Sequence, residues 1–274
     1  MLIRAGYKIG IECEAETPLM ALLSVHPCRA ADLQTPAIIT SNGWARLSAS
    51  IDEFGNLRTR TMAPAGTIEL STDFVIEDSG LPDEVAPWAT EVPVAELPDE
   101  AVSFLSGSRY CETDQLSSLA WSLFGCAPRG WGRVQAIVDY VHRHLTFGYQ
   151  FARSTRTAFE AHQERVGVCR DFAHLAIALC RCMNIPARYA TGYLGDICVP
   201  LSPAPMDFSA WFEVFLSGRW YTFDARHNVP RVGRILMARG RDAADCAITT
   251  TFGGSKLVEF KIVTEEVGAI SLAA

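Results

Sequence analysis

Hydrophobic and polar positions alternate in short runs along the first 77 residues, with proline, glycine and asparagine between the runs. An alternation of period two is typical of strands that bury one face. The pattern predicts strands at residues 7–15, 37–40, 44–52 and 67–77. Because short strands at close spacing are typical of sandwiches, we expect a β-rich, sandwich-like N-terminal domain at residues 1–80.

An acidic, proline-rich passage follows at residues 77–100, and its prolines forbid regular structure in most places. We interpret residues 81–110 as an extended linker between two domains. Beyond the linker the hydrophobic pattern changes to a spacing of three to four residues, which is typical of amphipathic helices. Residues 111–274 are therefore expected to form a second domain.

This second pattern predicts helices at residues 113–124, 131–145 and 170–183. In the third helix, Phe172, Leu175 and Leu179 belong to one apolar stripe, and Pro186 marks its end. Five strand-like runs follow, at residues 187–194, 210–216, 219–225, 247–253 and 257–266. A helix-rich block followed by an antiparallel sheet indicates the α+β class.

The composition is that of an ordinary globular protein, since 49% of the 274 residues are hydrophobic and 20% are charged. A net charge of −7 without any run of lysine or arginine argues against a nucleic-acid surface. No apolar stretch approaches the ~20 residues that span a bilayer, and the first residues lack the apolar segment of a secretory signal. We therefore expect a cytoplasmic protein that binds neither nucleic acid nor membrane. Nothing in the sequence indicates an oligomeric state.

The nine cysteines are odd in number, and no two of them are separated by two residues. Cys180 and Cys182 stand one residue apart, a poor spacing for a zinc knuckle. Disulfides are not expected in a chain without an export signal. The sequence therefore predicts no metal site and implies no cofactor, and most of the cysteines are interpreted as small apolar side chains.

Cys169 differs from the others because it stands directly before the third predicted helix. A helix N-terminus presents unpaired N–H groups and the positive end of the dipole, and both stabilise a thiolate. Gly167 lets the chain approach the helix start closely. In the first turn, Asp171 suits the same dipole. These residues leave two interpretations open for Cys169, a nucleophilic thiol or a buried structural one.

A thiolate that attacks an acyl group needs a base and a group that orients the base. Residues 209–228 are predicted to form a hairpin with a two-residue turn at 217–218. In that register Trp211 stands opposite Asp224, and both share one face of the sheet with Ser209. We expect the base and its orienting group on this face.

Three ordered motifs then carry a resemblance to a known family. They are G-x-C-R-D-F-x-H-L from Gly167, I-P-A-R-Y-x-x-G-Y from Ile185, and A-W-F-E-V…W…F-D-A from Ala210. Together they resemble the bacterial transglutaminase-like (transglutaminase/protease) superfamily over about residues 135–228. The resemblance implies a papain-like core, with the cysteine helix packed on an antiparallel sheet, preceded by a β-domain. It also implies a Cys, His, Asp triad acting on amide or thioester substrates, with a peptide or protein amide as the partner.

Carried over by position, the resemblance makes Cys169 the nucleophile and Asp224 the orienting acid. The position of the family histidine is held by Ser209. Serine is not a base near neutral pH, and the loss of a general base costs about two to four orders of magnitude in rate. Three explanations are open: a fold kept for binding, an active enzyme with a substituted base position, or another histidine that substitutes.

The nearest substitute base is His227. The hairpin register places it on the opposite face of the sheet, unless the strand ends or bulges after Ala225. The other histidines have structural interpretations. We expect His174 to make a hydrogen bond in the core, while His142 and His144 end a helix, where a cation suits the dipole.

Tyr149, Trp211 and Arg170 are predicted to line the cleft, with ordinary packing as the alternative for the two aromatic residues. The sequence thus predicts a cysteine enzyme, a protease, amide hydrolase or acyl transferase, whose activity is low or absent because of Ser209. The alternative hypothesis is a non-catalytic module that binds a peptide or protein in the same cleft.

Overall fold

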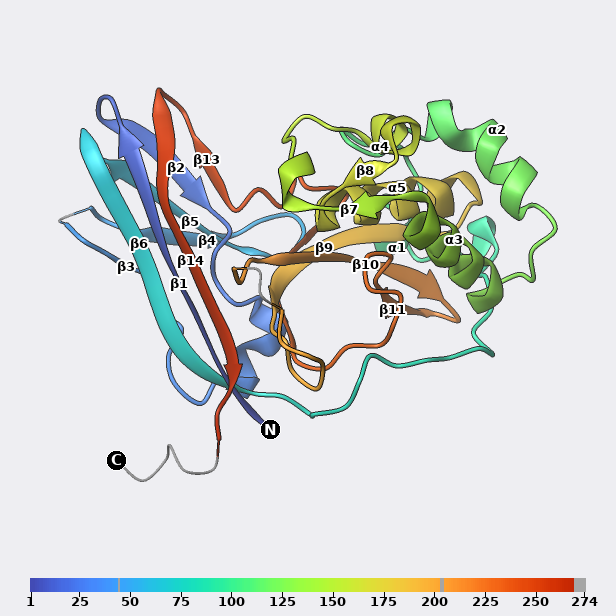
Figure 1. Cartoon of the computed structure of the whole chain (residues 1–274), viewed down its shortest axis with the longest axis horizontal. Coiled ribbons are helices and arrows are strands. Elements are labelled where there is room, and N and C mark those ends of the chain that lie inside the picture. Colours follow the sequence, from blue (N-terminus) through green and yellow to red (C-terminus); the bar gives the residue numbers. More distant parts are fainter. Residues whose placement is uncertain (44, 203–204, 269–274) are drawn as a thin grey trace.

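The computed structural model describes residues 1–43, 45–202 and 205–268, and it consists of two lobes that lie side by side (Figure 1). A β lobe, at the left of the view, holds long strands from both ends of the chain, and a core lobe at the right holds the helices. The mixed α and β architecture confirms the predicted class. The predicted strand 44–52 begins at Trp44, which lies outside the described residues.

The β lobe consists of two sheets, each with four strands in the described part of the chain. The strands are β1 (Leu2–Cys13), β2 (Thr17–Ala21), β3 (Thr40–Ser41), β4 (Ser48–Ile51), β5 (Leu57–Ala63), β6 (Gly66–Glu77), β13 (Thr249–Thr251) and β14 (Ser255–Glu266). One sheet has the order β14-β1-β6-β3 and the other β13-β2-β5-β4. Alternate side chains of β1 and β6 are apolar and buried, which is why these strands pack one face into a common core.

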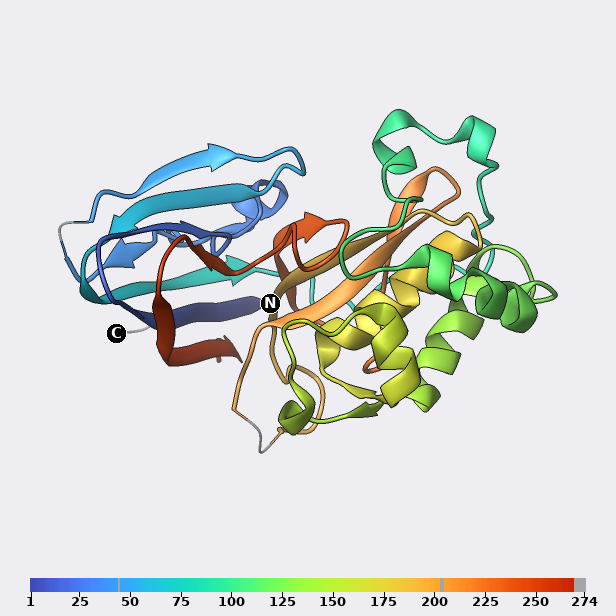
Figure 2. The same cartoon turned by 90° about the horizontal axis from the view of Figure 1, so that it is seen from above.

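The core lobe combines helices with a sheet of order β11-β10-β9-β12. Its helices are α1 (Asp99–Val102), α2 (Thr113–Phe124), α3 (Trp131–His144), α4 (Ala158–Glu164) and α5 (Cys169–Cys182). Its strands are β7 (Thr146–Phe147), β8 (Val166–Gly167), β9 (Ala187–Leu194), β10 (Ser209–Leu216), β11 (Arg219–Phe223) and β12 (Arg234–Gly240). Figure 2 shows α2 to α5 gathered on one side of the β9–β10 sheet, whereas Ala101 of α1 packs with Phe215 on the other face. Helix α5 packs on that sheet and on α2, α3 and α4, so it is buried on nearly all sides.

The last two strands do not join the sheet of the core lobe. β14 pairs with β1 along its length, and β13 pairs with β2. The sequence pattern assigns residues 111–274 to one core domain, of which residues 269–274 lie outside the described residues. In the structure, however, residues 249–266 return to the β lobe and cover strand edges of β1 and β2. A local pattern identifies a strand but not the partner with which it pairs.

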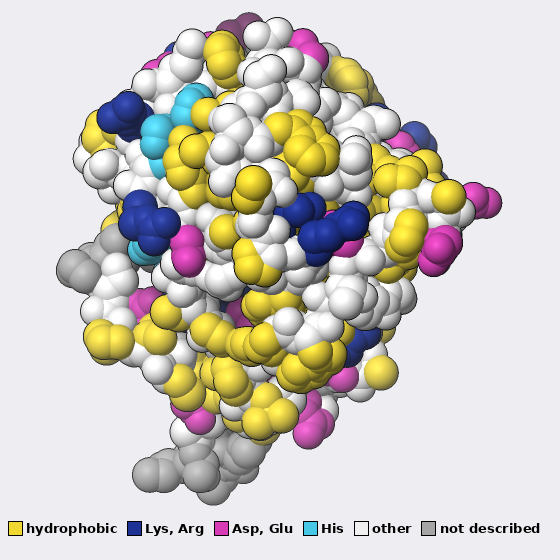
Figure 3. Space-filling model, turned by 90° about the vertical axis from the view of Figure 1, so that its right-hand side faces the viewer, with side chains coloured by type: hydrophobic (Ala, Val, Ile, Leu, Met, Phe, Trp, Pro, Cys, Tyr) yellow, Lys and Arg dark blue, Asp and Glu magenta, His cyan; other side chains and the backbone are white. Residues whose placement is uncertain are grey.

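One hydrophobic cluster extends across both lobes. Tyr193 of β9 and Ile235 of β12 belong to the same buried cluster as the strands of the β lobe, and the Tyr193 ring meets Phe74 of β6 edge-on at 5.7 Å. The connection from β6 runs along the molecule, where Leu81 and Trp88 are each 70% exposed. Viewed onto the core lobe, hydrophobic and charged side chains are interspersed over the surface (Figure 3).

The hairpin of β10 and β11 has the predicted register. Leu216 pairs with Arg219, as a two-residue turn requires. Ser217 and Gly218 form the turn with φ of 47° and 83°, the left-handed values that twist a hairpin correctly. The pairing ends at Phe223, one residue earlier than the predicted pair of tryptophan and aspartate. The chain beyond is therefore free to turn.

Candidate active site around Cys169

The start of α5 is held by a tight first turn. Cys169 is the first residue of the helix, and the N–H of Val168 donates to the carboxylate of Asp171 at 2.9 Å. At Gly167 a Cβ would stand 2.6 Å from the Cβ of Asp171. Glycine is required there because any other side chain would collide with the carboxylate that closes the turn.

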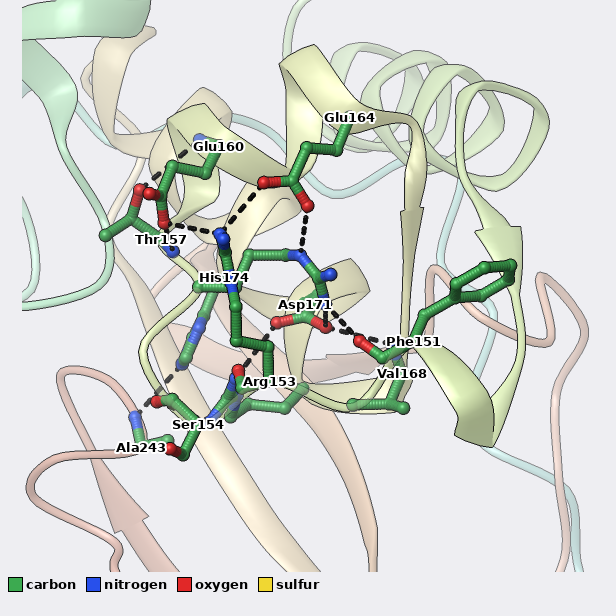
Figure 4. Close-up of polar contacts among 12 residues, drawn as sticks. Phe151, Arg153, Ser154, Thr157, Glu160, Glu164, Val168, Asp171, His174 and Ala243 are labelled. Atoms are coloured by element: carbon green, nitrogen blue, oxygen red, sulfur yellow. Dashed lines mark hydrogen bonds and ion pairs between the residues drawn. The ribbon is translucent and has the colours of Figure 1, made fainter.

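An ion network ties this turn to its surroundings (Figure 4). The fully buried side chain of Asp171 pairs with Arg156 at 3.0 Å and with Arg170 at 3.2 Å. Arg156 continues to Glu164 at 2.9 Å, and Arg153 also reaches Glu164 at 2.9 Å. Because a buried charge is costly unless it is paired, the network fixes α4 and the preceding loop against the cysteine turn.

Arg170, the residue after Cys169, lines the same cavity as the thiol, but its guanidinium is already bonded within the protein. It donates to the carbonyl of Ser154 at 3.0 Å and to that of Arg153, and it stands 5.5 Å from the ring centre of Tyr110. His174, which is fully buried, is stacked on the same ring, with the two ring centres 5.2 Å apart. Its Nε2 accepts the N–H of Ala243 at 3.1 Å, which confirms the predicted structural hydrogen bond.

Cys169 lines a cavity of about 460 Å³ between the two lobes, together with Asp207 and Ser209. Burial raises the pKa of the Cys169 thiol to about 11, and Asp207 acts in the same direction. Arg226 and the N–H of Ala210 oppose this increase without cancelling it. The sequence predicts that the helix end favours the thiolate. In the structure, burial of the thiol disfavours the charged form more strongly, so the pKa of Cys169 is raised.

Ser209 stands where the resemblance places it, beside the thiol cavity. It is the first residue of β10, pairs with Gly192 and is 5% exposed. Its carbonyl accepts the hydroxyl of Thr191 at 3.0 Å, whereas its Oγ has no hydrogen-bond partner among the described residues. A buried hydroxyl without a partner is uncommon, and the residue that carries this one lines the cavity that holds Cys169.

Asp224 is buried, and its carboxylate is fully engaged. The N–H of His227 donates to Oδ1 at 3.0 Å, the Nδ1 of His227 lies 2.9 Å from Oδ2, and Arg234 donates to Oδ2 at 2.9 Å. Burial alone would raise the pKa of Asp224, but Arg234 and His227 together hold it well below its usual value. The acid is thus ionised, and it orients His227 rather than a group at position 209.

The prediction that His227 faces away from Asp224 requires β11 to continue through residue 227. The strand ends at Phe223 instead, so the prediction does not hold. The chain turns after Phe223, and the bond to Asp224 fixes the imidazole. His142 supports the turn, since its Nδ1 lies 3.0 Å from the carbonyl of Arg226. His227 lines a second cavity, of about 50 Å³. The segment 207–209 lines both cavities.

The two aromatic candidates lie elsewhere. Trp211 is 2% exposed, packs with Ala190 and Leu236, and has the guanidinium of Arg234 5.0 Å from its ring centre. It does not line the thiol cavity, so the packing alternative applies to it. Tyr149 is 40% exposed and lines the small cavity beside His227.

Sequence reasoning missed Asp207 and Arg226, the charged groups with the strongest influence on the thiol. Burial raises the pKa of Asp207, against the opposing influence of Arg226. The available signal was position, because Asp207 stands two residues before Ser209 and Arg226 two residues after Asp224.

No group of three or more His, Cys, Asp or Glu side chains within residues 1–43, 45–202 and 205–268 is arranged to hold a metal ion. Over the same described ranges, no helix has both the length and the apolar content to cross a membrane. What the site does contain is a half-buried thiol, a serine hydroxyl and an aspartate–histidine pair that lines a different cavity. Among these groups, the sulfur in its deprotonated form is the strongest nucleophile.

Comparison with known proteins connects this arrangement to a family. Residues 122–225 match the model of the transglutaminase-like superfamily. A solved structure described as a "putative cysteine protease" from Cytophaga hutchinsonii is 29% identical, with a TM-score of 0.84 over 98% of this chain and 91% of that chain. The similarity therefore extends over both lobes and is not confined to the motifs.

Two mycobacterial relatives are themselves uncharacterized. The protein of Mycobacterium leprae is 34% identical over 109 residues, which is 38% of this chain and 38% of that protein. The protein of Mycobacterium tuberculosis is 28% identical over 220 residues, which is 72% of this chain and 69% of that protein. The first match thus spans little more than a third of the relative's length.

Proposed function

Because residues 122–225 of this chain belong to the transglutaminase-like superfamily, we propose that Cys169 is the nucleophile of an enzyme that cleaves or transfers acyl groups. One observation carries the proposal: Cys169 begins a rigidly held helix and lines a cavity with Ser209, the position of the family histidine. A peptide or protein amide is the proposed natural substrate, and we place the enzyme in the cytoplasm.

In the proposed reaction the Cys169 sulfur attacks the acyl carbon, a C–S bond forms, and the leaving group departs. Water or an amine then attacks the thioester and releases the thiol. An amine leaves only after it receives a proton, and Ser209 does not supply one at neutral pH. A phenolate or a thiolate departs without that proton. We therefore propose slow turnover of amides and faster acylation by activated esters or thioesters.

The experiment compares a p-nitrophenyl ester and a p-nitroanilide of the same acyl group. We expect the ester to acylate Cys169, detected by mass spectrometry, at least about a hundred times faster than the anilide, because only the anilide needs a general acid. Cys169→Ala should abolish the acylation. Cys126→Ala is the matched control, since Cys126 is an exposed cysteine outside the site. The proposal fails if the ester leaves Cys169 unmodified.

A non-catalytic binding module is the second candidate, and the thiol itself favours it. With a pKa of about 11, Cys169 is almost entirely protonated at neutral pH. A module of this kind would keep its affinity for a peptide when Cys169 is replaced by alanine, and it would show no acylation of Cys169 by either reagent. Peptide affinity of Cys169→Ala and acylation of Cys169 by the two reagents therefore separate the enzyme from the binding module.

A further inference from the structure

The cavity at Cys169 is built by both lobes. The core lobe contributes the thiol and Ser209, and the opposite wall comes from Ile9 of β1 together with Leu257 and Phe260 of β14. These strands belong to the β lobe, which has no part in the thiol chemistry. A cavity of this volume is within the range that holds a small ligand, so the lobe that forms its wall also decides what fits.

The wall is held in place by aromatic contacts. Phe208, the residue before Ser209, meets the ring of Phe260 edge-on at 5.8 Å. The same Phe208 ring lies 5.0 Å from Tyr193 and 6.2 Å from Tyr7. Such edge-to-face arrangements are favourable geometries. The β14 wall is therefore pre-positioned relative to the strand that carries position 209.

Strand β14 turns one face toward the core lobe. Ile262 and Thr264 are buried there, whereas Val263, between them, points outward and is 40% exposed. Toward the cavity end of the strand, Phe260 is 37% exposed and Leu257 is 54% exposed. Apolar side chains left this open to solvent beside a thiol have no partner that fully covers them among the described residues.

Charge is confined to the thiol end of the cavity. Arg170 lines it, but its guanidinium already donates to the carbonyls of Arg153 and Ser154. Asp207 also lines the cavity, and its carboxyl group forms no ion pair with a cationic side chain among the described residues. A negatively charged ligand would therefore meet Asp207 without gaining a free cation, and the β14 end offers it only apolar surface.

We infer that the β lobe sets the substrate preference of the Cys169 site, and that the wall of Ile9, Leu257 and Phe260 accepts an uncharged apolar side chain next to the acyl carbonyl. The inference rests on the proposed function, because it assumes that the carbonyl approaches the Cys169 sulfur. It names the class of substrate: an acyl group with an aromatic or branched aliphatic side chain, in preference to an acidic one.

The test uses chloromethyl ketones of N-acetyl leucine, phenylalanine and glutamate, which alkylate a thiol without needing turnover. Cys169 labelling is followed by mass spectrometry, and each rate is divided by the rate with iodoacetamide. We expect the leucine and phenylalanine reagents to react at least about tenfold faster than the glutamate reagent, since burial of one such side chain accounts for a factor of that order.

Leu257→Lys tests the wall itself, and the half-exposed position tolerates a long polar side chain. The new ammonium should lower the leucine-to-glutamate rate ratio by about tenfold, because an acidic side chain gains a cation on the wall. Val263→Lys is the matched control, with the same change of charge on the same strand but on its outer face. Its rate ratio should equal that of the unmodified protein.

Each result has a distinct meaning. Iodoacetamide labelling of Cys169 without discrimination among the ketones overturns the inference and leaves the proposed function intact. The same holds if Val263→Lys changes the ratio as much as Leu257→Lys does. If no reagent labels Cys169, the proposed function and the inference both fail. Should Leu257→Lys not fold, Phe260→Ala replaces it, and loss of the preference for the phenylalanine reagent is the supporting result.

Discussion

Two buried aspartates, Asp171 and Asp224, flank the proposed site. Their hydrogen bonds and ion pairs are of the same kinds, but they hold different parts of the structure in place. Each accepts backbone N–H groups from its own turn and pairs with a buried arginine. The partners of Asp171 all hold the helix start that carries the thiol. Those of Asp224 hold a turn and His227, which lines a separate cavity. The proposed nucleophile, Cys169, is therefore firmly positioned, while Asp224 and His227 are bonded to each other.

The missing connection between the two regions is position 209. Position 209 lines both the cavity of the thiol and the cavity beside His227. Serine is too short to join them and carries no proton that titrates near neutral pH. The comparison teaches that a positioned thiol and a positioned acid do not make a catalytic relay without a base that touches both.

The largest effect is expected for Asp171→Asn, which tests the helix-start side. The substitution keeps the size of the side chain but leaves Arg156, 5% exposed, without its buried partner. Removing one member of a buried ion pair costs about 3 kcal/mol. We expect urea unfolding to show a loss of stability of that order.

The control is Asp73→Asn, which breaks an ion pair between side chains that are 59% and 49% exposed, Asp73 and Arg4. An exposed pair contributes about 0–1 kcal/mol. If both variants lose equally little, the network does not hold the cysteine turn, and the contrast drawn between the two aspartates is unfounded.

Ser209→His should restore the connection, with the next largest effect. In the unmodified protein we expect the rate of Cys169 labelling by iodoacetamide to rise with pH toward the thiol pKa of about 11. An imidazole beside the sulfur favours the thiolate at lower pH, so labelling at pH 7 should increase by about two orders of magnitude. The variant profile should also level off earlier.

Ser209→Asn serves as the control for this prediction, because it adds a polar group of intermediate size without a base. Its pH profile should follow that of the unmodified protein. A Ser209→His profile that shows no new titration would mean that position 209 does not face the thiol. The helix start with Cys169 and the turn with Asp224 and His227 would then be independent of each other, even with a base at position 209.

The sequence predicts much of the core lobe because the relevant signals are local. The periodic apolar pattern predicts α2 at 113–124, and the two-residue turn predicts the register of β10 and β11. It also identifies β14 as a strand, though not as a partner of β1. That pairing joins residues more than two hundred positions apart, and a short-range pattern carries no information about it.

Within the site, too, the local sequence motifs predict some features and miss those that depend on tertiary packing. The motifs bring Cys169 and Ser209 to one cavity, as the hairpin argument requires. They do not reveal that burial outweighs the helix end in setting the pKa of the thiol. Nor do they place Trp211 in the core or His227 on Asp224, because both follow from where β11 ends and what packs beside it.

His227→Gln has the smallest expected effect on the reactivity of the Cys169 thiol. It tests whether the Asp224–His227 pair influences that thiol. The rate of Cys169 labelling should change by less than about twofold, because the His227 ring is bonded to Asp224 and lines a different cavity from the thiol. Stability should fall by about 1 kcal/mol at pH 7 through the weaker bond to Asp224, measured by urea unfolding.

The pH dependence of stability gives an independent measure of the same bond. The pKa of Asp224 is lowered in the folded state, so its ionised form stabilises the protein above the ordinary carboxyl range, and that contribution is lost as the pH falls below about 4. In His227→Gln the pKa is lowered less, so acidification should remove less stability. If labelling of Cys169 instead falls more than about tenfold, His227 acts as the base for the thiol, and the separation of the two regions is wrong.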